Sequence, residues 1–170
     1  MSSRKRSTPK KVDFGNEEIA QILMDMATYW GMDGVEYKRR AYEMAAADVK
    51  IFPDRLSDIH EHAGVKGLTE IPSVGEKIAK HIGELLTTGK LREYKEFKKK
   101  YPVNLRELLL LEGVGPRTIR ELWLRLKIRN LEDLEKACRS GKVRSLPRFG
   151  IKSEERIASA IQRLKESHST

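Results

Sequence analysis

The stretch IPSVGEKIAKHI, residues 71–82, recurs in this sequence as LEGVGPRTIREL at residues 111–122 and, more divergently, as LPRFGIKSEERI at residues 146–157. Each copy has an apolar residue, two variable residues, a second apolar residue, a glycine, a variable residue and then Lys or Arg. The twelfth position is again apolar. Because such repetition marks a repeated structural unit, we expect three helical hairpins, of which the third is degenerate.

Each copy places its glycine where a tight turn leads into the next helix, at Gly75, Gly115 and Gly150. A glycine lets a ligand approach the backbone without meeting a Cβ atom, and the free N–H groups of a helix start attract phosphate oxygens. A basic residue follows two positions later, at Lys77, Arg117 and Lys152. The pattern favours contacts to a phosphate backbone, which do not read base sequence. The alternative is a plain helical hairpin with a solvated cation.

The charge balance supports a polyanionic partner. The 34 Lys and Arg residues outnumber the 25 Asp and Glu residues, so that the net charge is +9, and nucleic acid is the leading candidate. A single cysteine, Cys138, gives no internal disulfide and no sign of an oxidising compartment. No stretch approaches the roughly 18 apolar residues of a membrane span. We therefore expect no membrane partner and an intracellular location, in the cytoplasm or nucleoid or, in a eukaryote, the nucleus.

The remaining segments read as helices. Four apolar residues between positions 19 and 26 recur at helical spacing and predict a helix over residues 16–30, with Asn16 as its N-cap. A second helix is expected over residues 35–52, and short helical pieces near residues 56–60 and 65 lead to the first copy. Since no segment alternates apolar and polar residues as strands do, we expect an all-α fold.

The chain divides into three parts on composition and on the placing of the repeats. We expect residues 1–15 to form a basic flexible arm, because the first eleven residues hold five Lys or Arg and almost nothing to bury. Residues 16–101 form a small helical domain with the first hairpin. Residues 102–170 form a second one with the second hairpin and the degenerate third.

SVGEKIAKHI and GVGPRTIREL resemble the two helix-hairpin-helix motifs of family X DNA polymerases, the repair enzymes related to DNA polymerase beta. The runs YKRRAYEMAAADVKIFP, IPSVGEKIAKHIGELLTTGKLREY, LLLLEGVGPRTIRELW and IRNLEDLEKA follow that family's order and spacing. LPRFGIKSEERIASAIQ is similar to the stretch before the palm domain in bacterial and archaeal members. The resemblance covers about residues 16–165. It implies an N-terminal domain like the family's 8-kilodalton domain, then a domain that clamps duplex DNA, and hence recognition of gapped or nicked DNA.

The chain stops where the family's palm domain would begin, and no Asp-x-Asp motif stands on a strand pattern. We therefore expect no nucleotidyl transfer from these 170 residues alone. Two interpretations stay open. The chain is a stand-alone relative without a palm, or it works with a palm in the same or another chain, in which case the whole is a DNA-directed DNA polymerase.

The resemblance also implies a set of DNA-contacting residues. A pocket for the 5′-phosphate falls on Lys38, Tyr42 and Lys77, and Tyr37 takes the position that stacks on a template base, although a packing role is equally open. For the second and third hairpins, the positions that we expect to contact the DNA backbone are Gly113, Gly115, Arg117, Arg120 and Lys152, in addition to Gly75 in the first.

In members with lyase activity, a lysine of the first domain attacks C1′ of an abasic deoxyribose phosphate. That position falls on His81, and a further lysine position falls on Glu93. Imidazole has no primary amine and forms no imine, so we expect the lyase to be absent or weak. Lys77 and Lys80 are the remaining amine candidates, with His81 as a base beside them. Whether the chain is an enzyme is thus left open.

The resemblance implies no required cofactor but a Na⁺ or K⁺ ion at each of the first two hairpins. Its ligands would be the backbone carbonyls of Thr69, Ile71 and Val74 in the first and of Leu109, Leu111 and Val114 in the second. A further hypothesis is a helical protein-interaction scaffold. It would place apolar residues on the hairpin tips, where this sequence has Glu76, Arg117 and Arg148.

Overall fold

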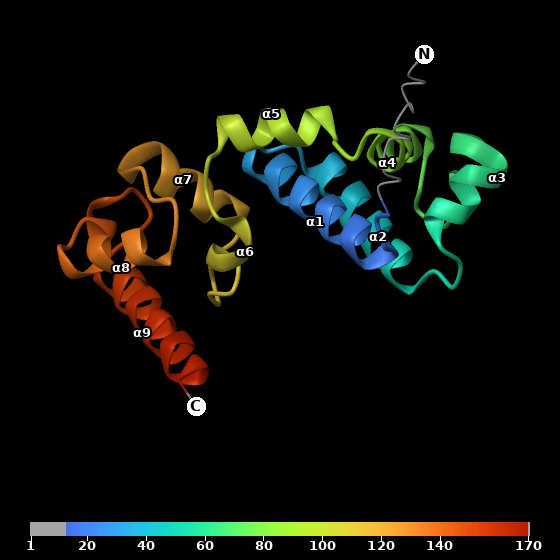
Figure 1. Ribbon diagram of the computed structural model, residues 1–170. Coiled ribbons are helices and arrows are strands. Elements are labelled where there is room, and N and C mark those ends of the chain that lie inside the picture. Colours follow the sequence, from blue (N-terminus) through green and yellow to red (C-terminus); the bar gives the residue numbers. More distant parts are fainter. Residues whose placement is uncertain (1–12, 170) are drawn as a thin grey trace, which may run out of the picture.

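The computed structural model describes residues 13–169, and every regular element in that range is helical (Figure 1). The all-α prediction is therefore confirmed. The basic arm expected at residues 1–15 lies almost wholly outside the described residues. The elements are, in chain order, α1 (Asn16–Met32), α2 (Glu36–Ile51), α3 (Leu56–Leu68), α4 (Glu76–Thr88), α5 (Arg92–Lys100), α6 (Leu105–Leu108), α7 (Pro116–Leu126), α8 (Leu131–Arg139), the 3₁₀ helix η1 (Val143–Ser145) and α9 (Ile151–His168).

The α1–α2 pair forms the centre of the molecule, with α5 alongside α1 (Figure 1). The apolar stripe that the sequence predicts on α1 is fully buried at Ile19, Leu23 and Met26. On α2 the buried positions include Ala45 and Ala46. Small side chains there allow the two helix backbones to approach closely, which is why a chain of modest apolar content still forms a continuous core.

Asn16 does not cap α1 as the sequence predicts. The N-cap of α1 is Gly15, with no side-chain hydrogen bond to the helix start. The Asn16 side chain reaches instead to the start of α3, where its Oδ1 accepts a hydrogen bond from the Leu56 N–H at 2.9 Å. Its Nδ2 donates to the Asp54 carbonyl at 2.8 Å. A short polar side chain caps whichever free N–H group tertiary packing brings nearest.

The first hairpin is built from α3 and α4. The two short helical pieces expected before the first copy appear as α3, which is interrupted at Gly64 by a backbone φ of 63°. Only glycine adopts that conformation readily, so Gly64 separates the two pieces. Gly89 ends α4 in the left-handed conformation, with a φ of 75°, as the sequence TTGK predicts.

Asp25, on α1, connects the last helix of the first predicted domain, α5, to the first helix of the second, α6. It is buried on α1, and its Oδ2 accepts hydrogen bonds from the Tyr94 hydroxyl on α5 at 2.7 Å and from Arg106 Nη2 on α6 at 3.1 Å. The domain boundary expected at residues 101 and 102 falls between α5 and α6, so that this carboxylate spans it. The helix α1 also contacts α7 directly.

Figure 1 shows the consequence for the hairpins. The first hairpin, α3 and α4, lies at one end of the molecule, and α8 and α9 lie at the other, with α1, α2 and α5 between them. None of the helices in residues 13–169 is long and apolar enough to cross a membrane.

Candidate nucleic-acid interface

The three copies of the repeat share one turn conformation. Their third residue has a positive φ in every case, 67° at Ser73, 82° at Gly113 and 70° at Arg148. The apolar residues that flank it are buried in the first two copies, and in the third Leu146 is buried while Phe149 is partly so. The divergent third copy therefore has the same turn as the first two.

The glycines of the repeat are not the strained positions. Gly75, Gly115 and Gly150 have extended backbones, with φ values of −82°, −119° and −154°, which any residue adopts. A Cβ atom built on each would meet no protein atom within 4 Å. These glycines do stand where the turn leads into the next helix, as expected, while the left-handed residue of the turn stands two positions earlier. What a glycine does provide is a bare backbone facing open space.

Each of these glycines is the N-cap of the helix that follows, and no side chain caps α4, α7 or α9. Where no side chain caps the helix, its first N–H groups lack partners, and they lie at the positive end of the helix dipole. The basic residues expected beside them, Lys77, Arg117 and Lys152, are all exposed. Each turn thus presents open backbone, free donors and a cation, which is the arrangement that holds a phosphate.

Lys38 and Lys77 are brought together from different helices. Lys38, on α2, is half-buried, with its Nζ 3.9 Å from the centre of the Trp30 ring. Burial and the neighbouring Lys77 ammonium both lower the pKa of Lys38. The two lysines predicted for the 5′-phosphate pocket therefore do lie next to each other.

His81 contacts both of the residues that face it. The Tyr42 hydroxyl is 2.8 Å from His81 Nδ1, and Glu93 Oε2 is 3.0 Å from His81 Nε2. Burial lowers the pKa of His81, with the Glu93 carboxylate acting in the opposite direction. A neutral imidazole matches this geometry, since Nδ1 accepts a hydrogen bond from the Tyr42 hydroxyl and Nε2–H donates one to Glu93.

This network changes the role expected for His81. With each ring nitrogen engaged by another side chain, His81 has no nitrogen free to act as a base on a ligand. Tyr42 is itself buried, and its hydroxyl is directed to His81. Burial keeps it protonated, because it raises the pKa of Tyr42 further above its ordinary value. The two positions where the resemblance expects lysines are occupied by residues that bond to each other.

Two other predicted residues are exposed. Tyr37, in the first turn of α2, has 73% of its surface accessible, so a packing role for its ring is wrong and the ring is open to a stacking partner. Lys80 is exposed on α4 and is not among the charged neighbours of Lys38 or His81. An amine at Lys80 therefore stands apart from this cluster.

The backbone carbonyls expected to hold a monovalent cation lie at the turns of the first two hairpins. In both, the central carbonyl, of Ile71 or Leu111, accepts one hydrogen bond, from the Val74 or Val114 N–H. The outer carbonyls, of Thr69 and Val74 or of Leu109 and Val114, accept no backbone hydrogen bond outside the helices. Neutral carbonyl oxygens fit Na⁺ or K⁺ better than a transition metal. No group of three or more His, Cys, Asp or Glu side chains stands ready for a metal within residues 13–169.

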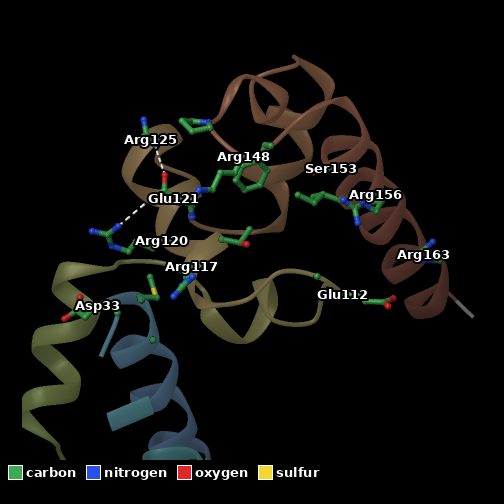
Figure 2. Close-up of a pocket in the computed structure, with 18 residues that line it drawn as sticks. Asp33, Glu112, Arg117, Arg120, Glu121, Arg125, Arg148, Ser153, Arg156 and Arg163 are labelled. Carbon is green, nitrogen blue, oxygen red and sulfur yellow. Dashed lines mark hydrogen bonds and ion pairs between the residues drawn. The ribbon is translucent and has the colours of Figure 1, made fainter. Parts of the chain in front are cut away.

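A cavity of about 1060 Å³ opens between α7, the third turn and α9 (Figure 2). Side chains from the α1–α2 loop and the second turn complete its wall, among them Asp33 and Glu112. We call it the arginine basin after the arginines that line it: Arg117, Arg120, Arg125, Arg148, Arg156 and Arg163.

Sequence reasoning predicted only part of this basin. Arg117, Arg120 and Gly113 were expected as DNA contacts and do line it, whereas Lys152 does not. The arginines of α9, Arg156 and Arg163, were missed. A signal for them exists in the sequence, because residues seven positions apart on a helix lie on one face.

Comparison with protein families finds a helix-hairpin-helix domain over residues 14–91 and a SAM-like helix-hairpin-helix tandem over residues 105–163. The chain is 30% identical over 146 residues to a Bacillus subtilis protein named DNA polymerase/3'-5' exonuclease PolX, a match that covers 85% of this chain and 25% of the relative. It is 28% identical over 121 residues to DNA polymerase lambda of Arabidopsis thaliana, and this match covers 71% of this chain and 22% of the relative. It is 31% identical over 133 residues to DNA polymerase type-X family protein pol4 of Schizosaccharomyces pombe, and this match covers 77% of this chain and 24% of the relative. The chain thus spans about a quarter of the length of these relatives.

Proposed function

Because this chain is a helix-hairpin-helix protein related over most of its length to family X DNA polymerases, we propose that it recognises gapped or nicked DNA and its 5′-phosphate. One observation carries the proposal. Three turns with the same left-handed third residue each present an open glycine backbone, a helix start without a side-chain cap and an exposed cation. Such contacts hold the phosphate backbone and leave the bases unread.

The separation of the hairpins supports a gap or nick as the target. The first hairpin lies at one end of the molecule and the second and third lie toward the other (Figure 1). A DNA ligand that contacts the first hairpin and the other two must present its phosphate backbone over a greater length than a single turn contacts. Two duplex arms joined through a gap or nick meet that requirement, since each arm engages its own hairpin.

The 5′-phosphate is assigned to Lys38 and Lys77. Two ammonium groups held together disfavour each other, and a phosphate between them removes that cost. Glu93 is also close enough to act on Lys38, but its carboxylate is engaged by His81. Lys77 is exposed and Lys38 is half-buried, so a phosphate can reach the pair from solvent.

The test compares two gapped duplexes that differ only in a 5′-phosphate or a 5′-hydroxyl, at one fixed salt concentration. We expect tighter binding of the phosphorylated duplex, and Lys77→Ala should remove this preference while weakening binding about tenfold. Lys80→Ala is the matched control, since it removes one exposed charge from the same helix. Equal affinities of the unmodified protein for the two duplexes would refute the pocket.

We infer that lyase activity is weak or absent. The position of the family's nucleophile holds His81, which is bonded to Tyr42 and Glu93. The amines that act electrostatically on His81, Lys77 and Lys38, are those assigned to the phosphate. Borohydride reduction on a 5′-incised abasic duplex should leave no covalent adduct. An adduct that persists in Lys80→Ala and disappears in Lys77→Ala would instead identify Lys77 as a Schiff-base lysine.

A scaffold that docks a protein partner is the remaining rival. Leu110 and Ile151, with 60% and 56% of their surfaces exposed, lie beside the second and third turns. Single exposed apolar residues are common on protein surfaces, and the charged tips Glu76, Arg117 and Arg148 are exposed as well. The scaffold interpretation requires negligible affinity for gapped DNA near physiological salt, which the same binding measurement checks.

We further propose that the module acts beside a catalytic palm domain, in the same chain or in another. The relatives named DNA polymerases are about four times longer than the matched region. Nucleotidyl transfer would belong to that palm, while these helices position the DNA.

A further inference from the structure

The arginine basin has more positive charge than its own carboxylates balance. Glu121 Oε2 accepts a hydrogen bond from Arg125 Nε at 2.7 Å, and Glu121 Oε1 lies 3.6 Å from Arg120 Nη1. Asp33, on the same wall, is bonded to Lys100 and Tyr101, which come from outside the basin. These contacts leave Glu112 as the one basin carboxylate without an ion pair in the described part of the chain.

Among the described residues, the basin arginines without an ion pair are Arg117 from the second hairpin and three from the third repeat and its helix. Arg148, Arg156 and Arg163 are exposed, and none of them has a carboxylate within ion-pair distance among residues 13–169. Figure 2 shows the three around the same hollow, Arg148 from the turn and the other two along α9. Because like charges held together repel, this arrangement costs stability unless an anion fills the hollow.

The size and lining of the basin limit what that anion is. About 1060 Å³ is close to the volume of a small-ligand site and too small to enclose a duplex, but it accommodates a few nucleotides of one strand. Phe149 also lines the cavity. A basic groove with an aromatic side chain in it is typical of single-strand binding, in which bases stack on the ring and arginines hold the phosphates.

We propose that the arginine basin binds a segment of single-stranded DNA that continues from the duplex held by the second hairpin. This inference rests on the proposed function and extends it, because it assigns the third repeat a ligand of its own. Arg117 and Gly113 join the two sites, since both belong to the second hairpin and both line the basin. The guanidinium fork suits phosphates along a flexible strand.

The experiment measures binding of the full chain to a labelled oligothymidylate of about 12 nucleotides, a length within the range of single-strand sites. The variant is Arg156→Gln with Arg163→Gln. We expect the affinity for the oligothymidylate to fall at least about fivefold, and the slope of log affinity against log salt to lose about 1.4, or about 0.7 for each lost phosphate contact. Neither arginine makes an ion pair in the described residues, so the fold should be retained, which a thermal melt checks.

The control is Lys136→Gln with Lys142→Gln, which removes two exposed charges that do not line the basin and, with Lys136, an exposed ion pair to Glu132. The control should bind the oligothymidylate like the unmodified protein. Equal losses in both double variants would overturn the inference, because they would reflect net charge alone. Unchanged oligothymidylate binding in the basin variant would also overturn it.

Gapped duplex serves as the second probe and separates this inference from the proposed function. We expect the basin variant to lose oligothymidylate binding while it keeps most of its affinity for a gapped duplex without overhangs. If both ligands are lost equally, the basin holds duplex backbone and the single-strand assignment is wrong. If the unmodified protein fails to bind gapped duplex but still binds oligothymidylate through Arg156 and Arg163, the proposed function fails and the basin assignment survives.

Discussion

His81 makes a contact through each of its ring nitrogens, and this decides what the first domain is able to do chemically. Burial favours the neutral imidazole, and the contacts with Tyr42 and Glu93 hold it in one orientation. A histidine held this way helps to fix the arrangement of the side chains around it. The cations that remain for a ligand are Lys38 and Lys77. At the scale of the residue, the cluster is therefore better suited to holding a phosphate than to covalent chemistry.

The lowered pKa of His81 makes a prediction about pH and stability. Burial is the main cause of the shift, and the charged groups around His81 are Glu93, Glu84, Lys77 and Lys38. Below the ordinary histidine pKa of about 6.5, the unfolded chain takes up a proton that the folded chain refuses. The free energy of unfolding should therefore fall as the pH drops through 6.5 toward the lowered pKa, and the loss is complete below it.

Urea midpoints at about pH 7.5 and about pH 5.5 measure this effect. In His81→Gln, the midpoint should fall less between the two pH values than in the unmodified protein. His62→Gln is the control, since His62 is exposed, and it should keep the full loss. An identical loss in His81→Gln and the unmodified protein would contradict the assignment.

Among the elements, the hairpin turn is the unit that repeats, and the two features that its three copies share have different causes. The left-handed residue at its third position is a requirement of the backbone, met by Gly113 in the second copy and by Ser73 and Arg148 in the others. The glycine two positions later meets no backbone requirement, because its φ is negative and its surroundings are open. A role in ligand approach explains it better than a role in folding.

Alanine substitutions in the second turn separate these two causes. Gly113→Ala should lower the free energy of unfolding by about 1 kcal/mol, because an alanine resists a φ of 82°. Gly115→Ala should leave stability within about 0.5 kcal/mol but weaken binding of gapped DNA, since its methyl group projects to where the backbone of the DNA would lie. Denaturant melts and binding titrations of both variants check this. A large destabilisation by Gly115→Ala would show that this glycine serves the fold.

For the whole molecule, the decisive contact is the one that fixes the spacing of the hairpins. The helix α1 packs on α2 and α5 and also touches α7. At the point of contact, a Cβ atom on Gly31 would lie 3.0 Å from Pro116 Cβ and 2.8 Å from Arg39 Cδ. Gly31 therefore allows the end of α1 to meet the first turn of α7, which directly follows the turn of the second hairpin.

Gly31→Val should push α7 away from α1. We expect a loss of about 1–3 kcal/mol in the free energy of unfolding from overpacking. The affinity for gapped DNA should fall more than the affinity for a short intact duplex, because only the gapped ligand needs both hairpins in register. Ala47→Val, at an exposed position of α2, is the control for a branched residue in a helix. Equal losses on the two DNA ligands would contradict a role in hairpin spacing.

The sequence by itself determined the helices, the repeated turns and the exposed cations beside them. All of these depend on residues within a few positions of each other, as for the apolar stripe of α1 or the left-handed Gly89 that ends α4. Only the tertiary structure decided which distant residues meet. In the folded chain His81 contacts Tyr42 and Glu93, and the Asn16 side chain bonds to the start of α3 instead of capping α1. Arginines from α7, the third turn and α9 line one basin. The physical reason is that helix formation follows local spacing, whereas these contacts depend on the angles at which separate helices pack.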